Sequence, residues 1–550
     1  MKKNFFIQQW RISSLEEIDM KTLNKILTNK YLWWILLFLV LIALFIPALA
    51  IKFSWIDDGY DILISRQIVN SIRSLDFKGL RIVFFEGNGR LRIIYWFYQA
   101  FEYLLGGTNP LIHFAVHFSV IFATSIFIFE IVKSFTKSNL AGFFSGLLYL
   151  LSPINTENIY RLGPQEPILA LFIVASLFYL IKRRFTLAIL FLFLATLTKE
   201  TGFVLWLPIL LVYLLKRVFY KKRDIDFKKY CLCGIVFSLP VLATTLFRKS
   251  GYSQNYAFNI GDMAHSFSYY LDSVVKGFAP FFGIFVLVYL ARLAWFFWKK
   301  RAEKEGLRFI EEGMFIAVFL VFLLIQLPWK FLLDRYLMPA TVGLVIFLGI
   351  EFSEVSRLLT YNIKLKSLLG GIFLIYLTFM IGGDTLRIYL QGVRTAYSTE
   401  FVQKLFSDLA VSVPKGGTVL YNFRQEEQTQ EPVIETGIHL GLFYNRPDIT
   451  VSYLDLKHLP NSRFFIVGTS IIPEQYQRGL IEASIINYKS EENRVQENKF
   501  LVLTTPFNLV KQISKKLVQF VVYRKPVTSE GIYTYYISKD YWYKYDVKKQ

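Results

Sequence analysis

Hydrophobic residues form long, nearly continuous blocks up to residue 383, and short polar or charged stretches separate one block from the next. A block of about 15–22 apolar residues is typical of a helix that crosses a hydrocarbon core about 30 Å thick. The pattern therefore predicts a polytopic α-helical membrane protein with about 11 transmembrane helices. We expect spans near residues 31–51, 110–132, 139–153, 166–181, 185–198, 201–216, 229–247, 277–298, 309–328, 337–352 and 367–383.

The segment Leu91–Leu105 is also apolar, but it is too short and too interrupted by polar residues to cross a bilayer. It carries Tyr95, Trp96 and Tyr98, and such aromatic residues are enriched at the depth of the lipid headgroups. We therefore predict a helix that lies in the membrane interface.

Lysine and arginine concentrate in alternate polar stretches between the apolar blocks, and the positive-inside rule places such stretches in the cytoplasm. They are the N-terminal arm (1–30) and residues 133–137, 182–184, 216–229, 299–308 and 357–366. We therefore predict a multi-pass protein of the cell (plasma) membrane with a cytoplasmic N-terminus. Its transmembrane domain would cover residues 31–384, and its first outer loop residues 52–110.

No spanning block follows residue 384, and the pattern changes to short runs rich in Val, Ile and Tyr that are bounded by turn residues. Such runs are typical of strands. They begin at Gly416, Asp448, Arg463 and Lys499. We predict a soluble extracytoplasmic α/β domain at residues 385–550, which is a normal domain size.

The net charge of +21 would suggest nucleic-acid binding in a soluble protein. Here 54% of the residues are hydrophobic and the excess of basic residues lies between apolar blocks, so we attribute the charge to topology and to anionic lipid. No nucleic-acid-binding motif is present, and we expect no nucleic-acid partner. Cys231 and Cys233 are the two cysteines and lie inside a predicted span, which excludes a disulfide framework and a cysteine zinc site.

An acidic pair, Asp57 and Asp58, directly follows the first apolar block. One carboxylate could act as a general base while the other orients a substrate or holds a cation. The alternative is a solvated helix cap at the start of an amphipathic stretch, residues 59–75.

The loop before the interfacial segment contains Glu86, Arg90 and Arg92 beside several glycines. The two arginines could bind a phosphate through forked hydrogen bonds. Taken alone, they also fit arginines that extend from a membrane surface into water.

A proline-rich loop follows the third predicted span and contains Glu157, Arg161 and Glu166. Glu157 and Arg161 have the spacing of an ion pair on one helix face. Glu166 opens the next span, where the helix dipole tolerates an anion.

Two further outer loops carry charged residues close to membrane depth. Lys199 and Glu200 lie between two apolar blocks with almost no loop, and Arg335 lies at the outer end of a late span. A charge near membrane depth costs roughly 2.5–3.5 kcal/mol on insertion scales, so such residues usually line a cavity.

His113 and His117 have the four-residue spacing that can bind a metal ion, but no Glu accompanies them as in a zinc-protease helix. We interpret them as packed or interfacial histidines. The sequence contains no Ser-His-Asp arrangement, Gly-rich phosphate loop or Walker motif that would indicate another chemistry.

The order of these features resembles the GT-C superfamily of membrane glycosyltransferases. The shared features are the acidic pair after the first span, an arginine before the interfacial helix, an acid before Pro167, Lys199-Glu200 after a short span, and Arg335-Tyr-Leu-Met-Pro at a late one. The resemblance covers roughly residues 31–385 and is strongest to the branch of protein O-mannosyltransferases and the lipid A aminoarabinose transferase. The tail resembles the outer α/β domain that many members carry.

The resemblance implies roles for individual residues. Asp57 matches the outer-loop acid that acts as a base or positions the acceptor, with Asp58 as its neighbour. Glu86 lies where relatives often carry a second acid, and Arg90 lies where they place a basic residue toward the donor phosphate. Many relatives have Lys-Pro-Pro there, whereas this chain reads Arg90-Leu-Arg92-Ile.

Glu166, Lys199 and Arg335 match an acidic and two basic positions of the family. The expected catalytic residues are thus Asp57 and Asp58. The expected donor phosphate-binding residues are Arg90, Arg92, Lys199 and Arg335. The expected substrate-positioning residues are Glu86, Glu166 and Glu200.

A transferase that faces outward would need residues with these roles. Nucleotide sugars are not made outside the cell, so the expected donor is a polyprenyl phosphate-linked hexose or pentose, and the acceptor an envelope glycan, lipid or protein. Cations would hold the leaving phosphate and a carboxylate would take the acceptor proton, with inversion at the anomeric carbon. No cofactor is required, although a divalent metal could bind at Asp57, Asp58 and Glu86.

Other interpretations of the pattern remain as alternatives. A transporter or flippase of a lipid-linked glycan would carry charges near the bilayer midplane and paired, broken hydrophobic segments, whereas here the charges cluster at the outer ends and no internal repeat is found. A catalytically inactive GT-C paralogue would explain the unusual arginine loop. A receptor that binds through its tail would leave the charged loops between spans unexplained.

Overall fold

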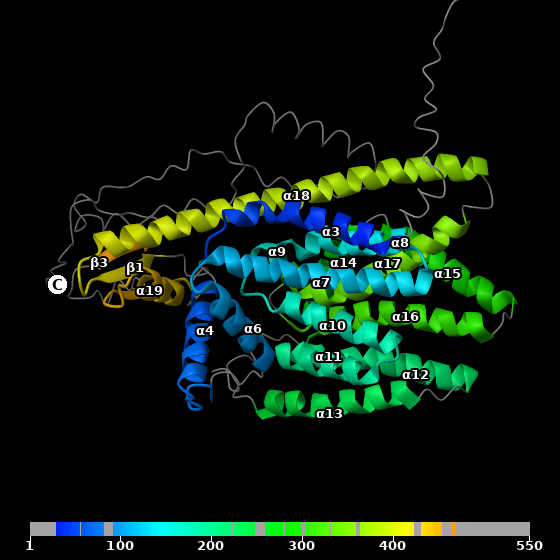
Figure 1. The fold of residues 1–550 in the computed structure, drawn as a ribbon, viewed down its shortest axis with the longest axis horizontal. Coiled ribbons are helices and arrows are strands. Elements are labelled where there is room, and N and C mark those ends of the chain that lie inside the picture. Colours follow the sequence, from blue (N-terminus) through cyan, green and yellow to red (C-terminus); the bar gives the residue numbers. More distant parts are fainter. Residues whose placement is uncertain are drawn as a thin grey trace, which may run out of the picture.

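A computed structural model shows the protein as a bundle of helices that lie side by side, with a small sheet at one end (Figure 1). Helix α18 (Ile363–Ser412) runs along the bundle and leads the chain to that sheet. The structure describes residues 29–54, 57–81, 92–221, 225–247, 259–278, 281–299, 303–329, 332–358, 363–422, 431–453 and 464–468.

Every apolar block predicted to span the membrane overlaps a helix of the bundle or α18, so the helical nature of these blocks is confirmed. The remaining bundle helices are α3 (Lys30–Phe45), α7 (Pro110–Thr136), α8 (Asn139–Leu150), α10 (Glu166–Ile181), α11 (Phe185–Thr198), α12 (Trp206–Tyr220), α13 (Ile225–Phe247), α15 (Phe281–Lys299), α16 (Glu303–Leu324) and α17 (Met338–Leu358).

Helix length and composition together limit how many of these elements can be assigned as spans. Among the described residues, three stretches are both long and apolar enough to cross a membrane: Pro110–Thr136, Glu200–Tyr220 and Asp334–Arg357. Helices α3 and α10 have 16 residues each, which corresponds to about 24 Å. The protein is thus a helical membrane protein, while the number of about 11 crossings stays a prediction.

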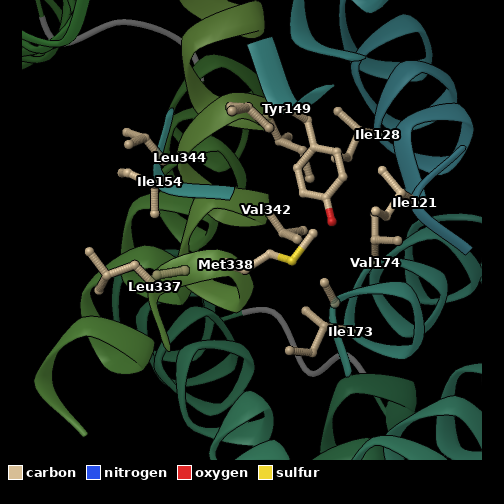
Figure 2. Close-up of a cluster of buried hydrophobic side chains, with 14 of the residues drawn as sticks. Ile121, Ile128, Tyr149, Ile154, Ile173, Val174, Leu337, Met338, Val342 and Leu344 are labelled. Carbon is tan, nitrogen blue, oxygen red and sulfur yellow. The ribbon is translucent and has the colours of Figure 1, made fainter. Parts of the chain in front are cut away.

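Hydrophobic side chains from four helices pack together inside the bundle (Figure 2). Ile121 of α7, Tyr149 of α8, Val174 of α10 and Val342 of α17 converge there, and all are almost fully buried. Helix α17 is the most enclosed of the three long apolar stretches, because neighbours cover it on most sides. Those neighbours are α7, α8, α10, α15 and α16, so α17 lies inside the bundle.

Short elements cap the end of the bundle that faces the sheet. Helix α4 (Asp58–Arg73) lies across this end, nearly at right angles to the bundle helices (Figure 1). Helix α6 (Ile93–Gly106) packs beside it, which confirms a helix in the predicted interfacial segment. The other short elements are η1 (Pro47–Leu49), η2 (Pro153–Asn155), α9 (Thr156–Tyr160), η3 (Glu200–Leu205) and η5 (Asp334–Leu337), and the remaining longer helix is α14 (Ile260–Phe278).

The sheet is parallel, with the strand order β2-β1-β3, and α19 (Glu431–Phe443) connects β1 to β2. The strands are β1 (Thr418–Asn422), β2 (Thr450–Tyr453) and β3 (Phe464–Gly468). They form at three of the four runs that the sequence predicts as strands. The run at Lys499 lies outside the described residues, so the α/β domain as a whole stays a prediction.

Helix α18 also crosses the predicted boundary between the two domains. The sequence predicts the end of the last span near residue 383, yet the helix continues without a break to Ser412. The residues after position 383 are more polar, but the backbone stays helical there. A helix can continue from an apolar into a polar environment without a break.

Candidate active site

The acidic pair lies at the start of α4, with the two side chains in different environments. Asp57 has φ 68° and ψ −33°, a conformation that is costly for a residue other than glycine. Its side chain makes no capping hydrogen bond to α4 and is 43% exposed, whereas Asp58 is 4% exposed. Asp58 Oδ2 instead accepts a hydrogen bond from the Ser54 N–H at 2.6 Å. The pair is therefore not an ordinary solvated helix cap.

A third carboxyl group, on Asp61, follows one helical turn after Asp57 and is buried. The Tyr95 hydroxyl of α6 lies 2.7 Å from Asp61 Oδ2 and 2.9 Å from the Gly163 carbonyl oxygen. Burial raises the pKa of Asp58 to about 6 and raises that of Asp61 well above its usual range, where the charge of Asp57 adds to the effect. Of the three, Asp57 is the carboxylate that an entering substrate can reach.

Arg161 connects this acidic cluster to the proline-rich loop. Its guanidinium pairs with Glu157, as the spacing of the two residues predicts, and its Nη2 atom also lies 3.4 Å from Asp57 Oδ2. Glu157 in turn accepts a hydrogen bond from Arg335 at 3.1 Å. Asp57, Arg161, Glu157 and Arg335 thus form a continuous chain of alternating charges.

Two predicted phosphate-binding cations meet at one aromatic ring. Lys199 Nζ lies 4.7 Å from the centre of the Tyr336 ring, and the Arg335 guanidinium carbon lies 5.3 Å from it. Lys199 also donates to Glu166 at 2.5 Å, so Glu166 holds the lysine in place. The structure therefore brings Lys199, Arg335 and Glu166 together, although they are far apart in the sequence.

Arg92 is the third described residue of the four that are expected to bind the donor phosphate. It has a different ion-pair partner from Lys199 and Arg335. Arg92 Nε lies 3.2 Å from Glu200 Oε2, and its side chain is 9% exposed. Glu200 is thus placed as the carboxylate that positions Arg92. Glu86 and Arg90 lie outside the described residues, and their predicted roles stay predictions.

No group of three or more His, Cys, Asp or Glu side chains is placed to hold a metal ion within the described part of the chain. Because Glu86 falls outside it, a metal at Asp57, Asp58 and Glu86 stays a prediction. The two histidines of α7 each contact a backbone carbonyl oxygen, His113 that of Gly107 at 2.9 Å and His117 that of Asn158 at 2.5 Å. Their interpretation as packed residues is confirmed.

Several residues at this site were missed by the sequence analysis. Asp61 carried a usable signal, because it lies one helical turn after Asp57. Arg161 was considered only as a partner of Glu157. Glu435 of α19 carried no signal at all, since it accepts a hydrogen bond from Gly59, 376 residues away along the chain.

The chain is similar to solved structures along most of its length, at low sequence identity. No protein-family model matches the chain, and no curated protein matches it by sequence. A crystal structure of ArnT from Cupriavidus metallidurans bound to undecaprenyl phosphate matches at 14% identity and a TM-score of 0.49, covering 81% of this chain and 94% of that one. The structure of the same ArnT in the apo state matches at 14% identity and a TM-score of 0.48, covering 82% and 95% of the two chains.

Proposed function

We propose that the protein is a membrane glycosyltransferase that transfers a sugar from a polyprenyl phosphate-linked donor to an envelope glycan, lipid or protein acceptor at the outer face. The observation that supports this most directly is the chain of charges from Asp57 through Arg161 and Glu157 to Arg335. It joins an accessible carboxylate to a cationic cluster, and a transfer reaction with a phosphate leaving group needs both.

Asp57 is the proposed general base. Its exposed side chain can accept the proton of an acceptor hydroxyl, whereas Asp58 and Asp61 are buried. The acceptor oxygen then bonds to the anomeric carbon as the bond from that carbon to the phosphate oxygen breaks. Because the acceptor attacks directly, the configuration at the anomeric carbon inverts.

Lys199 and Arg335 are the proposed phosphate-binding residues, with Arg92 as a further cation at the rim of the site. They would stabilise the electron pair that stays on the phosphate, so no separate general acid is needed. Glu166 and Glu157 hold the two cations in the absence of substrate. A donor phosphate would share these cations with the two carboxylates.

The test is sugar release from radiolabelled polyprenyl phosphate sugars by the purified protein, with an envelope extract as the source of acceptor. We expect release by the wild type, and a rate about 100- to 10,000-fold lower for Asp57→Asn. Asp76→Asn is the matched control, because Asp76 is an exposed acid just beyond α4 and should leave the rate unchanged.

The remaining outcomes separate the alternatives. If no donor is cleaved but labelled lipid crosses the bilayer of a proteoliposome, the protein is a flippase. Release that continues unchanged in Asp57→Asn would remove Asp57 as the base. Treatment with EDTA in the same assay tests whether a divalent metal takes part.

A further inference from the structure

We infer that α19 completes the active site, and that its residue Glu435 is a positioning residue for Asp57 and Asp58. Helix α19 packs against α4 at the sheet end of the bundle (Figure 1). This inference rests on the proposed role of Asp57, but the contact that carries it can be tested without any assay of activity.

The side-chain carboxyl group of Glu435 binds backbone N–H groups in the first turn of α4. Its Oε2 atom accepts a hydrogen bond from the Gly59 N–H at 2.9 Å, and its Oε1 atom accepts one from the Tyr60 N–H at 3.2 Å. The first N–H groups of a helix have no partner within the helix, so they require acceptors from elsewhere. Glu435 supplies both oxygens from an element that is distant in the sequence.

Residue 59 must be small for this contact to form. A Cβ atom at Gly59 would overlap Glu435 Oε2 and would lie 2.8 Å from Cδ2 of the His439 ring. The glycine therefore lets the carboxyl group and the imidazole of α19 lie directly against the backbone that follows Asp58.

The segment before the acidic pair is held by α18, the helix that precedes β1 and α19 in the chain. Gln403 of α18 donates to the Phe53 carbonyl oxygen at 2.9 Å, and Thr399 Oγ1 accepts from the Lys52 N–H at 3.0 Å. Asp57 lies between these contacts and those of Glu435, with a positive φ angle. A backbone conformation of this kind persists only where the surroundings fix it, and α18 and α19 fix it from both sides.

The burial of an acidic side chain at this position argues against simple packing of one element on another. Burial raises the pKa of its carboxyl group to about 8, and the nearby charge of Asp58 contributes to the rise. A buried acid beside two other acids is unfavourable unless it satisfies groups that an apolar side chain would leave unpaired. The two N–H groups of α4 are such groups.

Hydrogen exchange and kinetics together test the inference. We expect Glu435→Ala to speed hydrogen exchange at the amides of Gly59 and Tyr60, and to lower kcat for sugar release about 10- to 100-fold with the donor KM unchanged. Glu435→Gln keeps one oxygen acceptor and should restore part of both properties. Glu400→Ala is the matched control, because Glu400 is exposed on α18 and makes none of these contacts.

Unchanged exchange at the two amides in Glu435→Ala would overturn the inference, as would equal effects of Glu435→Ala and Glu400→Ala on kcat. If Glu435→Ala fails to fold, Gly59→Ala provides the same test, because its methyl group displaces the carboxyl group while Glu435 remains. A wild type that cleaves no donor but shows the expected exchange would contradict the proposed function and leave the contact established.

Discussion

Arg161 is the residue whose position most changes the interpretation of the site. Viewed along the sequence, it is one half of a local ion pair with Glu157. In the folded protein it also contacts Asp57, and it lowers the pKa of Asp58 against the larger effect of burial. One guanidinium group thus lies between the proposed base and the acid that holds Arg335, and we expect it to orient both.

Substitution of Arg161 tests this role at the scale of a single residue. We expect Arg161→Gln to lower kcat about 100-fold, because Asp57 loses the contact that orients it and Arg335 loses a fixed partner. Steady-state kinetics with the same labelled donor measures the effect. Arg66→Gln on the exposed side of α4 is the control, and equal rates for the two variants would contradict the prediction.

At the scale of elements, apolar periodicity predicts the helices well because burial along one helix is a local property of the sequence. Blocks 166–181 and 185–198 coincide with α10 and α11 to the residue. The contacts of Asp57 with Arg161, and of Glu435 with Gly59, depend instead on how separate elements pack. No pattern within a single segment indicates such packing, so these contacts between separate elements could not be predicted.

The docking of α19 on α4 gives the protein a pH-dependent stability. Glu435 has a usual pKa of 4.5 and a raised pKa of about 8 in the folded protein. Between these values the folded state holds a proton that the unfolded chain has released, so the contribution of Glu435 to stability falls as the pH rises from about 4.5 to about 8.

Thermal melting between pH 5 and pH 9 measures this effect. We expect the melting temperature of the wild type to fall across the range, and the slope to be smaller in Glu435→Gln. Identical slopes in the two proteins would contradict the assignment of the raised pKa to Glu435.

A second group of charges joins α15, α16 and α17, and the sequence analysis did not identify it. Arg292 of α15 pairs with Glu351 of α17 and lies 3.2 Å from Glu312 of α16, and both carboxylates are fully buried. Arg308 binds Glu312 at 2.9 Å and Glu354 at 2.7 Å. Each buried acid therefore has a cationic partner, which indicates a structural connection between the three helices.

Removing the central cation should destabilise the bundle. We expect Arg292→Met to lower the free energy of unfolding by about 3–5 kcal/mol, because two buried carboxylates lose a partner. Arg357→Met is the control, since the Arg357 side chain is 69% exposed and its ion pair should contribute at most about 1 kcal/mol. Melting temperatures in detergent that fall equally for both variants would contradict this prediction.

At the scale of the whole molecule, the chemistry-capable residues lie near α4, α6 and α19, at the end of the bundle that faces the sheet (Figure 1). The distribution of basic residues predicts that this end faces outward. The predicted orientation of the protein in the membrane rests on the loops at both ends of the helices. It can be tested by asking which side of the membrane an exposed residue at each end faces.

Cysteine labelling tests the orientation in a background without Cys231 and Cys233. We expect Lys78→Cys, after α4, to react with a membrane-impermeant maleimide in intact cells. Lys221→Cys, after α12, should react only once the membrane is permeabilised. Both positions are exposed, so the opposite pattern would reverse the predicted topology.

The uninterrupted course of α18 has a mechanical consequence. A helix of 50 residues is about 75 Å long, well over twice the thickness of a hydrocarbon core of about 30 Å. Bilayers of different thickness change the tilt of embedded helices, and a stiff rod of this length turns a small tilt into a large displacement at its far end. Because that far end holds the backbone just before Asp57, we expect the lipid composition of the membrane to change the geometry of the site.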